Sequence, residues 1–367
     1  MADNRGIIDR SGHIVELQSL RGIAATAVLI GHALIYYETP SWFETLAHTF
    51  NGRTAVVVFF VLSGYVLTRS LQNSRFDRDS VFTFYVQRIF RIYPAIWTSS
   101  ALGLAYLFWL HWQIPVEHTS GLVRSQFRED RFDLLHITAS LAGMTTFILP
   151  QLWTIFVEII ASIALPAIAF ITLHRRPWYF KMLAIAILIS ITIPNTYYHV
   201  TMYFMDFVVG AGLVVFAAKW FEKAPARILV PAGIVVLALT QDIPSDYYNP
   251  FVHLLETAVA VSVIGMLIAA RERILVLRSR ALLFLGDISY SVYLLHYVVI
   301  CIMAKLLTVM HIGLGTIPLS VLLASMALSV TLPLSWASYI WVEKPGIRLG
   351  KQGLRHTQAL LYAARRP

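Results

Sequence analysis

Long apolar segments recur along almost the whole chain, separated by short stretches that carry most of the charge. Crossing a bilayer as a helix takes about 20 apolar residues. Ten segments approach or reach that length, at roughly 22–37, 54–71, 92–112, 152–173, 178–194, 200–218, 226–241, 251–270, 284–308 and 317–342. Only 13% of the 367 residues are charged, against about 25% in soluble domains. We therefore expect an all-α fold, a polytopic helix bundle embedded in a lipid bilayer.

The positions of Lys and Arg predict how such a bundle is oriented. If the N-terminus is cytoplasmic and the apolar piece 134–149 does not cross, 24 of the 29 Lys and Arg residues fall in cytoplasmic segments. Counting 134–149 as a crossing would place Arg175 and Arg176 outside and invert every later loop. That piece is short for a span and could be re-entrant or a half-helix.

We therefore predict about ten transmembrane helices with both termini cytoplasmic. The domain organisation that follows is a cytoplasmic tail at 1–21, a transmembrane domain at 22–345 and a short basic cytoplasmic tail at 346–367. The first 21 residues lack the pattern of a cleaved signal peptide, so the first span is expected to serve as the insertion signal.

The basic net charge does not indicate a nucleic-acid partner. The +9 charge lies between hydrophobic segments, where orientation in the membrane explains it. The single cysteine, Cys301, excludes an internal disulfide and gives no metal cluster. We expect no metal site and no nucleic-acid binding.

The first apolar segment carries two ionisable residues, Arg21 and His32. Eleven helical steps return to nearly the same face, about 16 Å further along the axis. Taken singly, Arg21 could be a membrane anchor and His32 a hydrogen-bonded core residue. Because ionisable groups inside a span are costly, their shared face favours a functional role.

Four charged residues at or inside later predicted spans are further candidates for a site. Arg88 and Arg91 lie three residues apart at the cytoplasmic start of the third span, where they could anchor the helix or clamp a phosphate. Glu158 lies inside a span, and Glu343 lies where the tenth span meets the cytoplasm. Each carboxylate could be half of a structural ion pair or part of a site.

The segment FLGDISYSVYLLHYVV adds a polar stripe to the ninth span. Gly286 and Asp287 resemble a helix start, with Asp287 or Ser289 as N-cap. Ser289, Tyr290, Tyr293 and His296 fall at i, i+3 and i+4 spacings and make this stripe, and His296 is a second intramembrane imidazole. Tryptophans at span ends are typical of an interfacial belt; Trp153 is the exception that we count toward a site.

Six motifs occur in an order that resembles the acyltransferase 3 family. They are R-x10-H in the first span, FFVLSGYVL, RIFRIYPAIW, LWTIFVE, LGDISYSVYLLHYVV and WVEKP, covering about residues 15 to 349. The resemblance implies a fold of about ten spans in the bacterial inner (plasma) membrane. It also implies acyl-CoA, most often acetyl-CoA, as cytoplasmic co-substrate with no bound cofactor, and a carbohydrate hydroxyl as acceptor.

The resemblance also implies roles for individual residues. His32 and Arg21 match the family's catalytic pair, and Glu343 matches its late acid. The substrate-binding candidates are Arg88, Arg91, Glu158, Trp153, Tyr290 and His296. The middle motif fits loosely, because the common form has Ser or Asn near the tryptophan where this chain has Thr154 and Ile155.

The implied chemistry is acyl transfer with His32 as general base, since a histidine pKa lies near neutral. Glu158 or Glu343 could orient His32, and an acyl-histidine intermediate is an alternative. Scattered intramembrane charges could instead form the pathway of a transporter, or the chain could be a non-catalytic part of a polysaccharide export machine. The acceptor, the acyl group and the oligomeric state cannot be read from these residues.

Overall fold

The structure is a computed structural model that describes residues 14–50, 52–126, 133–243, 249–269 and 274–364; in these ranges all regular structure is helical. Ten helices coincide with the ten predicted segments. They are α1 (Val15–Leu34), α3 (Gly52–Ser70), α4 (Arg78–Tyr106), α7 (Leu152–His174), α8 (Arg176–Thr192), α9 (Val200–Phe221), α10 (Ala226–Leu239), α11 (Pro250–Ala269), α12 (Arg280–Val309) and α13 (Thr316–Ser338). The predicted tail residues 1–13 and 365–367 lie outside the described ranges.

Seven helical stretches of the described chain are long and apolar enough to cross a membrane. Of the ten coincident helices, α8 has 17 residues and α10 has 14, both below the usual length of a span. Helix α4, which coincides with the third predicted span, is 29 residues long but carries several charges in its first half. The chain is thus a helical membrane protein, while the count of ten spans and the cytoplasmic termini remain predictions.

The apolar piece 134–149 forms only a short helix, α6 (Leu134–Leu141). Eight residues rise about 12 Å, too little to cross a bilayer. Beyond α6 the backbone turns at Gly143, whose φ is +74°, and continues without helix until α7. Two other short helices, α2 (Ser41–His48) and α5 (Gly121–Arg124), belong to the connections between spans.

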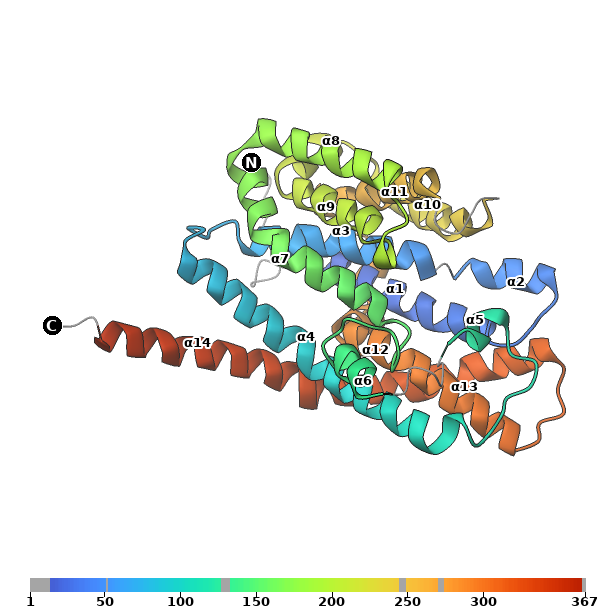
Figure 1. The fold of residues 1–367 in the computed structure, drawn as a ribbon. Coiled ribbons are helices and arrows are strands. Elements are labelled where there is room, and N and C mark those ends of the chain that lie inside the picture. Colours follow the sequence, from blue (N-terminus) through green and yellow to red (C-terminus); the bar gives the residue numbers. More distant parts are fainter. Residues whose placement is uncertain (1–13, 51, 127–132, 244–248, 270–273, 365–367) are drawn as a thin grey trace.

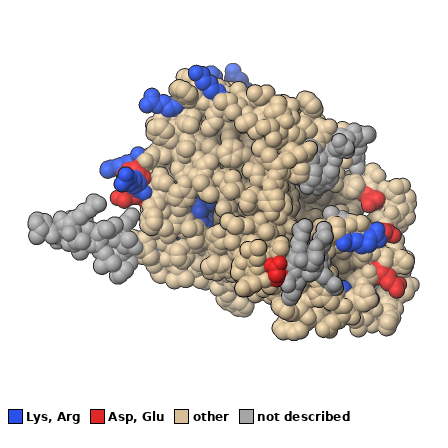
Figure 2. Space-filling model, in the orientation of Figure 1, with Lys and Arg blue, Asp and Glu red and all other residues tan. Residues whose placement is uncertain are grey.

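The long helices run side by side, and their connections alternate between the two ends of the bundle (Figure 1). The links from α3 to α4 and from α7 to α8 lie at the end where α14 (Lys344–Ala364) leaves the molecule. The links from α1 to α2 and from α12 to α13 lie at the opposite end. Charged side chains gather at these two ends on the face shown in Figure 2, with few in the broad band between them. A membrane-spanning bundle is expected to show this distribution.

Two large apolar cores divide the bundle into halves. One core joins α3, α9 and α11, with Val57, Phe207 and Ile264 among its buried side chains. The other joins α1, α4, α12 and α13, with Leu29 and Ile96 among its members. The seventh helix contributes to both cores, so it connects the two halves.

The first helix packs tightly on α12 through glycine. A Cβ atom on Gly22 would lie 2.6 Å from the backbone nitrogen of Gly286, a distance that a real side chain cannot occupy. The Gln18 side chain, one turn earlier, donates to Asp287 at 2.7 Å and to the Leu283 carbonyl at 3.1 Å. Small residues at such crossings are typical of membrane helices, and this crossing fixes the register of α1 against α12.

The predicted helix start at Gly286 and Asp287 is wrong. The twelfth helix begins at Arg280, and Ser279 is its N-cap, with its side chain accepting from the Leu282 amide. The helix starts earlier because Ser279 caps it and the residues that follow, RALLFL, contain no helix breaker before Gly286. The first helix likewise begins at Val15, so Arg21 lies in its second turn.

The last span does not end in a loop. After α13 the backbone forms a π-helical turn, Tyr339–Glu343, and continues directly into α14. Gly346 and Gly350 of α14 pack against Phe90 of α4, where a Cβ on Gly350 would lie 2.8 Å from the Phe90 side chain. Glu343 is therefore held between α13 and a helix that is anchored on α4.

Candidate active site

Three helices, α1, α4 and α7, and the π-helical turn Tyr339–Glu343 bring five charged side chains together near the end of the bundle where α14 leaves. Arg21 of α1 interacts electrostatically with Arg91, Glu158, Glu343 and Arg88. We call these five residues the charged cluster. The three guanidinium groups and two carboxylates leave one formal positive charge, so the cluster favours an anion.

The tightest contact in the charged cluster is an ion pair between α4 and α7. An Nη atom of Arg88 lies 2.6 Å from a carboxylate oxygen of Glu158, and the side chains are only 10% and 18% exposed. Arg88 also donates to the Ser162 hydroxyl at 3.0 Å. Arg88 therefore has fixed partners within the protein.

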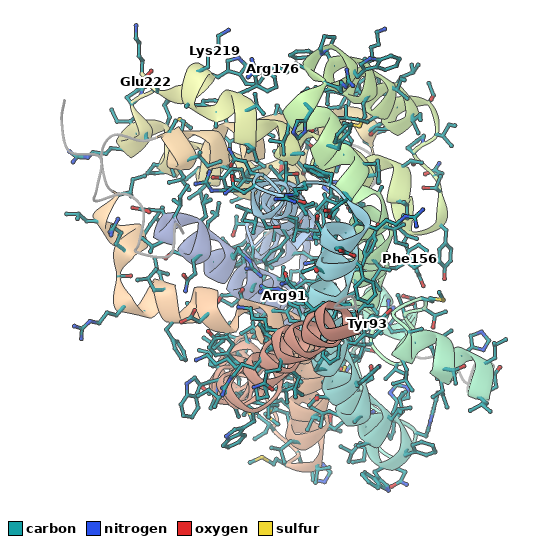
Figure 3. The ribbon with its side chains drawn as sticks, turned by 90° about the vertical axis from the view of Figure 1, so that its left-hand side faces the viewer. Arg91, Tyr93, Phe156, Arg176, Lys219 and Glu222 are labelled. Atoms are coloured by element: carbon teal, nitrogen blue, oxygen red, sulfur yellow. The ribbon has the colours of Figure 1, made fainter. Side chains whose placement is uncertain are left out.

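Arg91, one turn later, is exposed. Figure 3 looks onto this end of the molecule and shows Arg91 near its centre, whereas Arg176, Lys219 and Glu222 lie toward its rim. Of the two arginines in the predicted clamp, Arg91 is thus the one that a ligand can reach from this end.

Glu343 is only 5% exposed, although it follows directly on the last span. Its carboxylate accepts a hydrogen bond from Ser291 of α12, and the Ser291 hydroxyl lies 2.8 Å from that of Ser338. Tyr290, beside Ser291, donates to the Ile92 carbonyl at 3.1 Å and interacts electrostatically with four members of the charged cluster. The predicted residues Tyr290 and Glu343 therefore meet the predicted arginines.

The two intramembrane histidines form a direct pair. Nδ1 of His32 lies 3.0 Å from Nε2 of His296, and the two rings are nearly parallel, with an angle of 5° between their planes. His296 is fully buried, whereas His32 is partly accessible. Because His32 follows Arg21 by eleven positions on α1, the pair lies about 16 Å further along the axis than Arg21.

The start of α7 supports this pair from one side. Thr154 donates to the Tyr293 hydroxyl at 2.9 Å, and Gln151 donates to the Leu294 carbonyl at 2.6 Å. Trp153 instead packs on Tyr203 of α9, with ring centroids 5.3 Å apart. No hydrogen bond or ring contact that the structure shows for Trp153 joins it to the histidine pair.

The sequence did not predict a role in the site for four of its residues: Gln151, Thr154, Ser162 and Ser291. Small polar residues in a span give little signal by themselves. The pairing of His32 with His296 had a signal, because the first and ninth spans run in the same direction. Both imidazoles then fall at similar depth, about ten residues beyond the start of each predicted span.

A second set of buried charges lies in the other half of the bundle. Arg53 contacts Glu256 at 2.7 Å, and Thr240 donates to the same carboxylate at 2.9 Å. Asp206 and His253 lie 3.4 Å apart, both almost fully buried. These residues pair locally between α3, α9 and α11, and they belong to a cluster separate from the five charged residues above.

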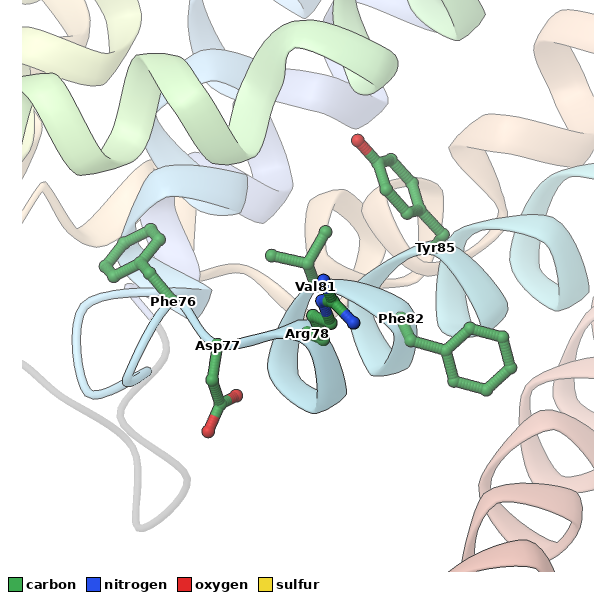
Figure 4. A pocket seen from close by; sticks show the side chains of 6 residues that line it. All are labelled: Phe76, Asp77, Arg78, Val81, Phe82 and Tyr85. Atoms are coloured by element: carbon green, nitrogen blue, oxygen red, sulfur yellow. The ribbon is translucent and has the colours of Figure 1, made fainter.

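A shallow cavity of about 370 Å³ lies at the first turns of α4, lined by Phe76, Asp77, Arg78, Val81, Phe82 and Tyr85 (Figure 4). Asp77 is the N-cap of α4, and hydrogen bonds from the Ser80 hydroxyl and amide lower the pKa of its carboxyl group. The lining is mainly apolar and aromatic. In the described ranges, no group of three or more His, Cys, Asp or Glu residues is arranged to hold a metal ion.

A comparison with protein families gives a match that covers most of the chain. The model of a family described as "Acyltransferase domain" matches residues 14–339. Glu343 lies four residues beyond the matched range. Comparisons with curated proteins and with solved structures gave no match.

Proposed function

The chain belongs to the acyltransferase 3 family of membrane acyltransferases, and on this premise we propose that it moves an acyl group from acyl-CoA to a carbohydrate hydroxyl. We propose acetyl-CoA as the donor, at the cytoplasmic face of the plasma (inner) membrane. The observation that carries the proposal is the charged cluster near one end of α1, with the partly accessible His32 further along the same helix.

The charged cluster suits the donor. Coenzyme A carries several phosphate charges on its nucleotide and a long neutral arm that ends in the thioester. Arg91 is exposed and Arg21 is partly accessible, so these two guanidinium groups can meet phosphate oxygens. The neutral arm then extends along α1 toward His32. Arg88, held by Glu158, keeps the cluster in place and adds positive charge.

The proposed reaction needs one base and no net proton. His32 removes the proton from the acceptor hydroxyl, whose oxygen attacks the thioester carbonyl. A carbon–oxygen bond forms and the carbon–sulfur bond breaks. The proton then passes from His32 to the leaving sulfur, which departs as the free thiol of coenzyme A. The products are a carbohydrate ester and coenzyme A.

The test is transfer of label from radiolabelled acetyl-CoA to glycan or lipid-linked sugar in membranes that contain the chain. We expect His32→Ala to abolish transfer while the protein inserts in equal amount. His136→Ala is the matched control, because His136 is on the short helix α6 and bonds to Asp133 away from the cluster. Near-normal transfer by His32→Ala would overturn the assignment of the base, and absence of any labelled sugar with the natural chain would overturn the acceptor class.

A further inference from the structure

We propose that His296 is a positioning residue that decides which ring nitrogen of His32 is the base. The inference rests on the proposed function, because it assigns a role within the same reaction. It goes beyond that function by naming the reacting atom, Nε2 of His32, and the residue that sets it.

The hydrogen positions on the two rings follow from the partners of His296. Nδ1 of His296 lies 2.7 Å from the backbone carbonyl oxygen of Tyr293, one turn earlier on α12. A carbonyl oxygen only accepts, so this nitrogen must carry a hydrogen. A neutral imidazole carries one ring hydrogen, and Nε2 of His296 is therefore an acceptor.

The tautomer of His32 follows in turn. Its Nδ1 atom lies 3.0 Å from the acceptor Nε2 of His296, so Nδ1 of His32 must be the donor. The remaining nitrogen, Nε2 of His32, is left with a free lone pair. Without His296 the two tautomers of His32 would both be open, and half of the possible arrangements would leave a hydrogen on the wrong atom.

The ring geometry fits a hydrogen bond of this kind. An imidazole N–H and an imidazole lone pair both lie in the planes of their rings. Planes that differ by only 5°, with ring centroids 5.2 Å apart, allow the N–H of one ring to point along the lone pair of the other. Tyr297 meets the His32 ring edge-on, with centroids 5.8 Å apart, and restricts its rotation.

The packing around the pair fixes its position along the membrane normal. The crossing of Gly22 and Gly286 sets the register of α1 against α12, and Gln151 and Thr154 tie α7 to α12 at Leu294 and Tyr293. These contacts hold α12 at Gly286, Tyr293 and Leu294, in the turns that lead up to His296. A hydrogen bond as short as 3.0 Å between two helices needs a register held to this degree.

The carboxylates of the site are engaged elsewhere. Glu158 bonds to Arg88, and Glu343 accepts from Ser291. Among the described residues, the hydrogen bonds of His32 and His296 involve one another and a backbone carbonyl, and none involves a carboxylate. The orienting role that Glu158 or Glu343 was expected to play for His32 thus belongs to a neutral imidazole.

A neutral partner has a chemical consequence. When Nε2 of His32 takes the hydroxyl proton, the Nδ1–H bond to His296 becomes charge-assisted and stronger. His296 can share the proton, because its own Nδ1–H already points at a carbonyl oxygen. Once the proton passes to the thiol leaving group, both rings are neutral again. The pair therefore carries no charge between turnovers. A carboxylate in the place of His296 would remain charged and unpaired at this depth of the membrane.

The test compares two substitutions at one position in the full-length chain in membranes. His296→Phe keeps an aromatic ring but offers no acceptor, whereas His296→Gln keeps an acceptor oxygen. We expect His296→Phe to lower turnover about 10- to 100-fold, because protonated His32 loses its charge-assisted hydrogen bond as well as its fixed tautomer, while the KM for acetyl-CoA stays within about 2-fold of the natural chain. His296→Gln should recover most of that loss, and the acid limb of the pH profile should shift in His296→Phe.

Nitrogen NMR of the ¹⁵N-histidine-labelled chain reports the tautomer without any substrate. We expect a His32 spectrum with hydrogen on Nδ1 in the natural chain and a mixture of tautomers in His296→Phe. The inference is overturned if the natural chain carries the hydrogen on Nε2 of His32, or if His296→Phe transfers label normally while His32→Ala does not. Normal transfer by His32→Ala would instead overturn the proposed base. The NMR measurement would then still decide whether His296 sets the tautomer of His32.

Discussion

Removing Arg88 should damage the fold more than it damages donor binding, whereas removing Arg91 should do the reverse. The Arg88–Glu158 pair has a separation of 2.6 Å and side-chain exposures of 10% and 18%. Two charges about 4 Å apart at an effective dielectric constant of about 20 attract by about 4 kcal/mol. Breaking a buried pair by truncating one partner costs about 3–5 kcal/mol, because the other charge is left alone.

The expected loss for Arg88→Ala is at the lower end of that range. Arg21 remains close enough to act on Glu158 and compensates in part. We therefore expect the free energy of unfolding to fall by about 3 kcal/mol, which is about 150-fold in the folding equilibrium. Because Arg91 is exposed, Arg91→Ala should lower the free energy of unfolding by less than about 0.5 kcal/mol. The same substitution should raise the KM for acetyl-CoA.

Unfolding in mixed micelles with an increasing fraction of denaturing detergent, followed by circular dichroism, measures both variants. Glu158→Gln added to Arg88→Ala removes the orphaned carboxylate and should restore part of the stability, which a double-mutant cycle quantifies. A loss below about 1 kcal/mol for Arg88→Ala would refute the reasoning, since it would mean that water already solvates the pair.

Other predictions concern the helix crossing, the late carboxylate and the start of α4. Gly22→Val should separate α1 from α12 and abolish transfer with a loss of about 2–3 kcal/mol in stability, because its Cβ meets the backbone at Gly286; unchanged unfolding would contradict this. Glu343→Gln should lower the KM for acetyl-CoA by about 3-fold or more, because the charged cluster gains one positive charge, and steady-state kinetics decide. Hydrogen bonds from Ser80 lower the pKa of the Asp77 carboxyl group, so its contribution to stability is complete above its ordinary pKa of 3.8 and is lost as the pH falls through the lowered pKa. Asp77→Asn should therefore flatten the acid side of the melting-temperature profile.

The sequence was sufficient to place the ten helices of the predicted spans, since hydrophobic length and charge are properties of single segments, but α14 was expected only as a basic tail. It was less informative about helix ends. Asp287 looked like an N-cap because apolar residues follow it, yet α12 begins at Arg280 and Asp287 instead accepts from Gln18 of another helix. A capping residue and a side chain at a helix crossing look the same in sequence.

The candidate site was predicted as a list of residues rather than as an arrangement. The five residues of the charged cluster meet one another, and His32 pairs with His296 further along α1. Apart from the similar depth of the two histidines, the sequence did not indicate which residues pair. Partner choice depends on the rotation of each helix, and that rotation is set by contacts such as Gly22 on Gly286. Trp153 shows the same limit, because its position in a motif did not reveal that it faces α9.

The π-helical turn at Tyr339–Glu343 bears on how chain length can vary among relatives. Five residues of π-helix cover about the rotation of four residues of α-helix, so such a turn absorbs one extra residue while the helices on either side stay in phase. A relative that lacks one residue here would keep α13 on α12 and Gly346 on α4. A deletion inside α1 would instead rotate all later positions of that helix by about 100° and part His32 from His296. Alignments of this family should therefore tolerate a one-residue gap at the end of the last span and none between Arg21 and His32.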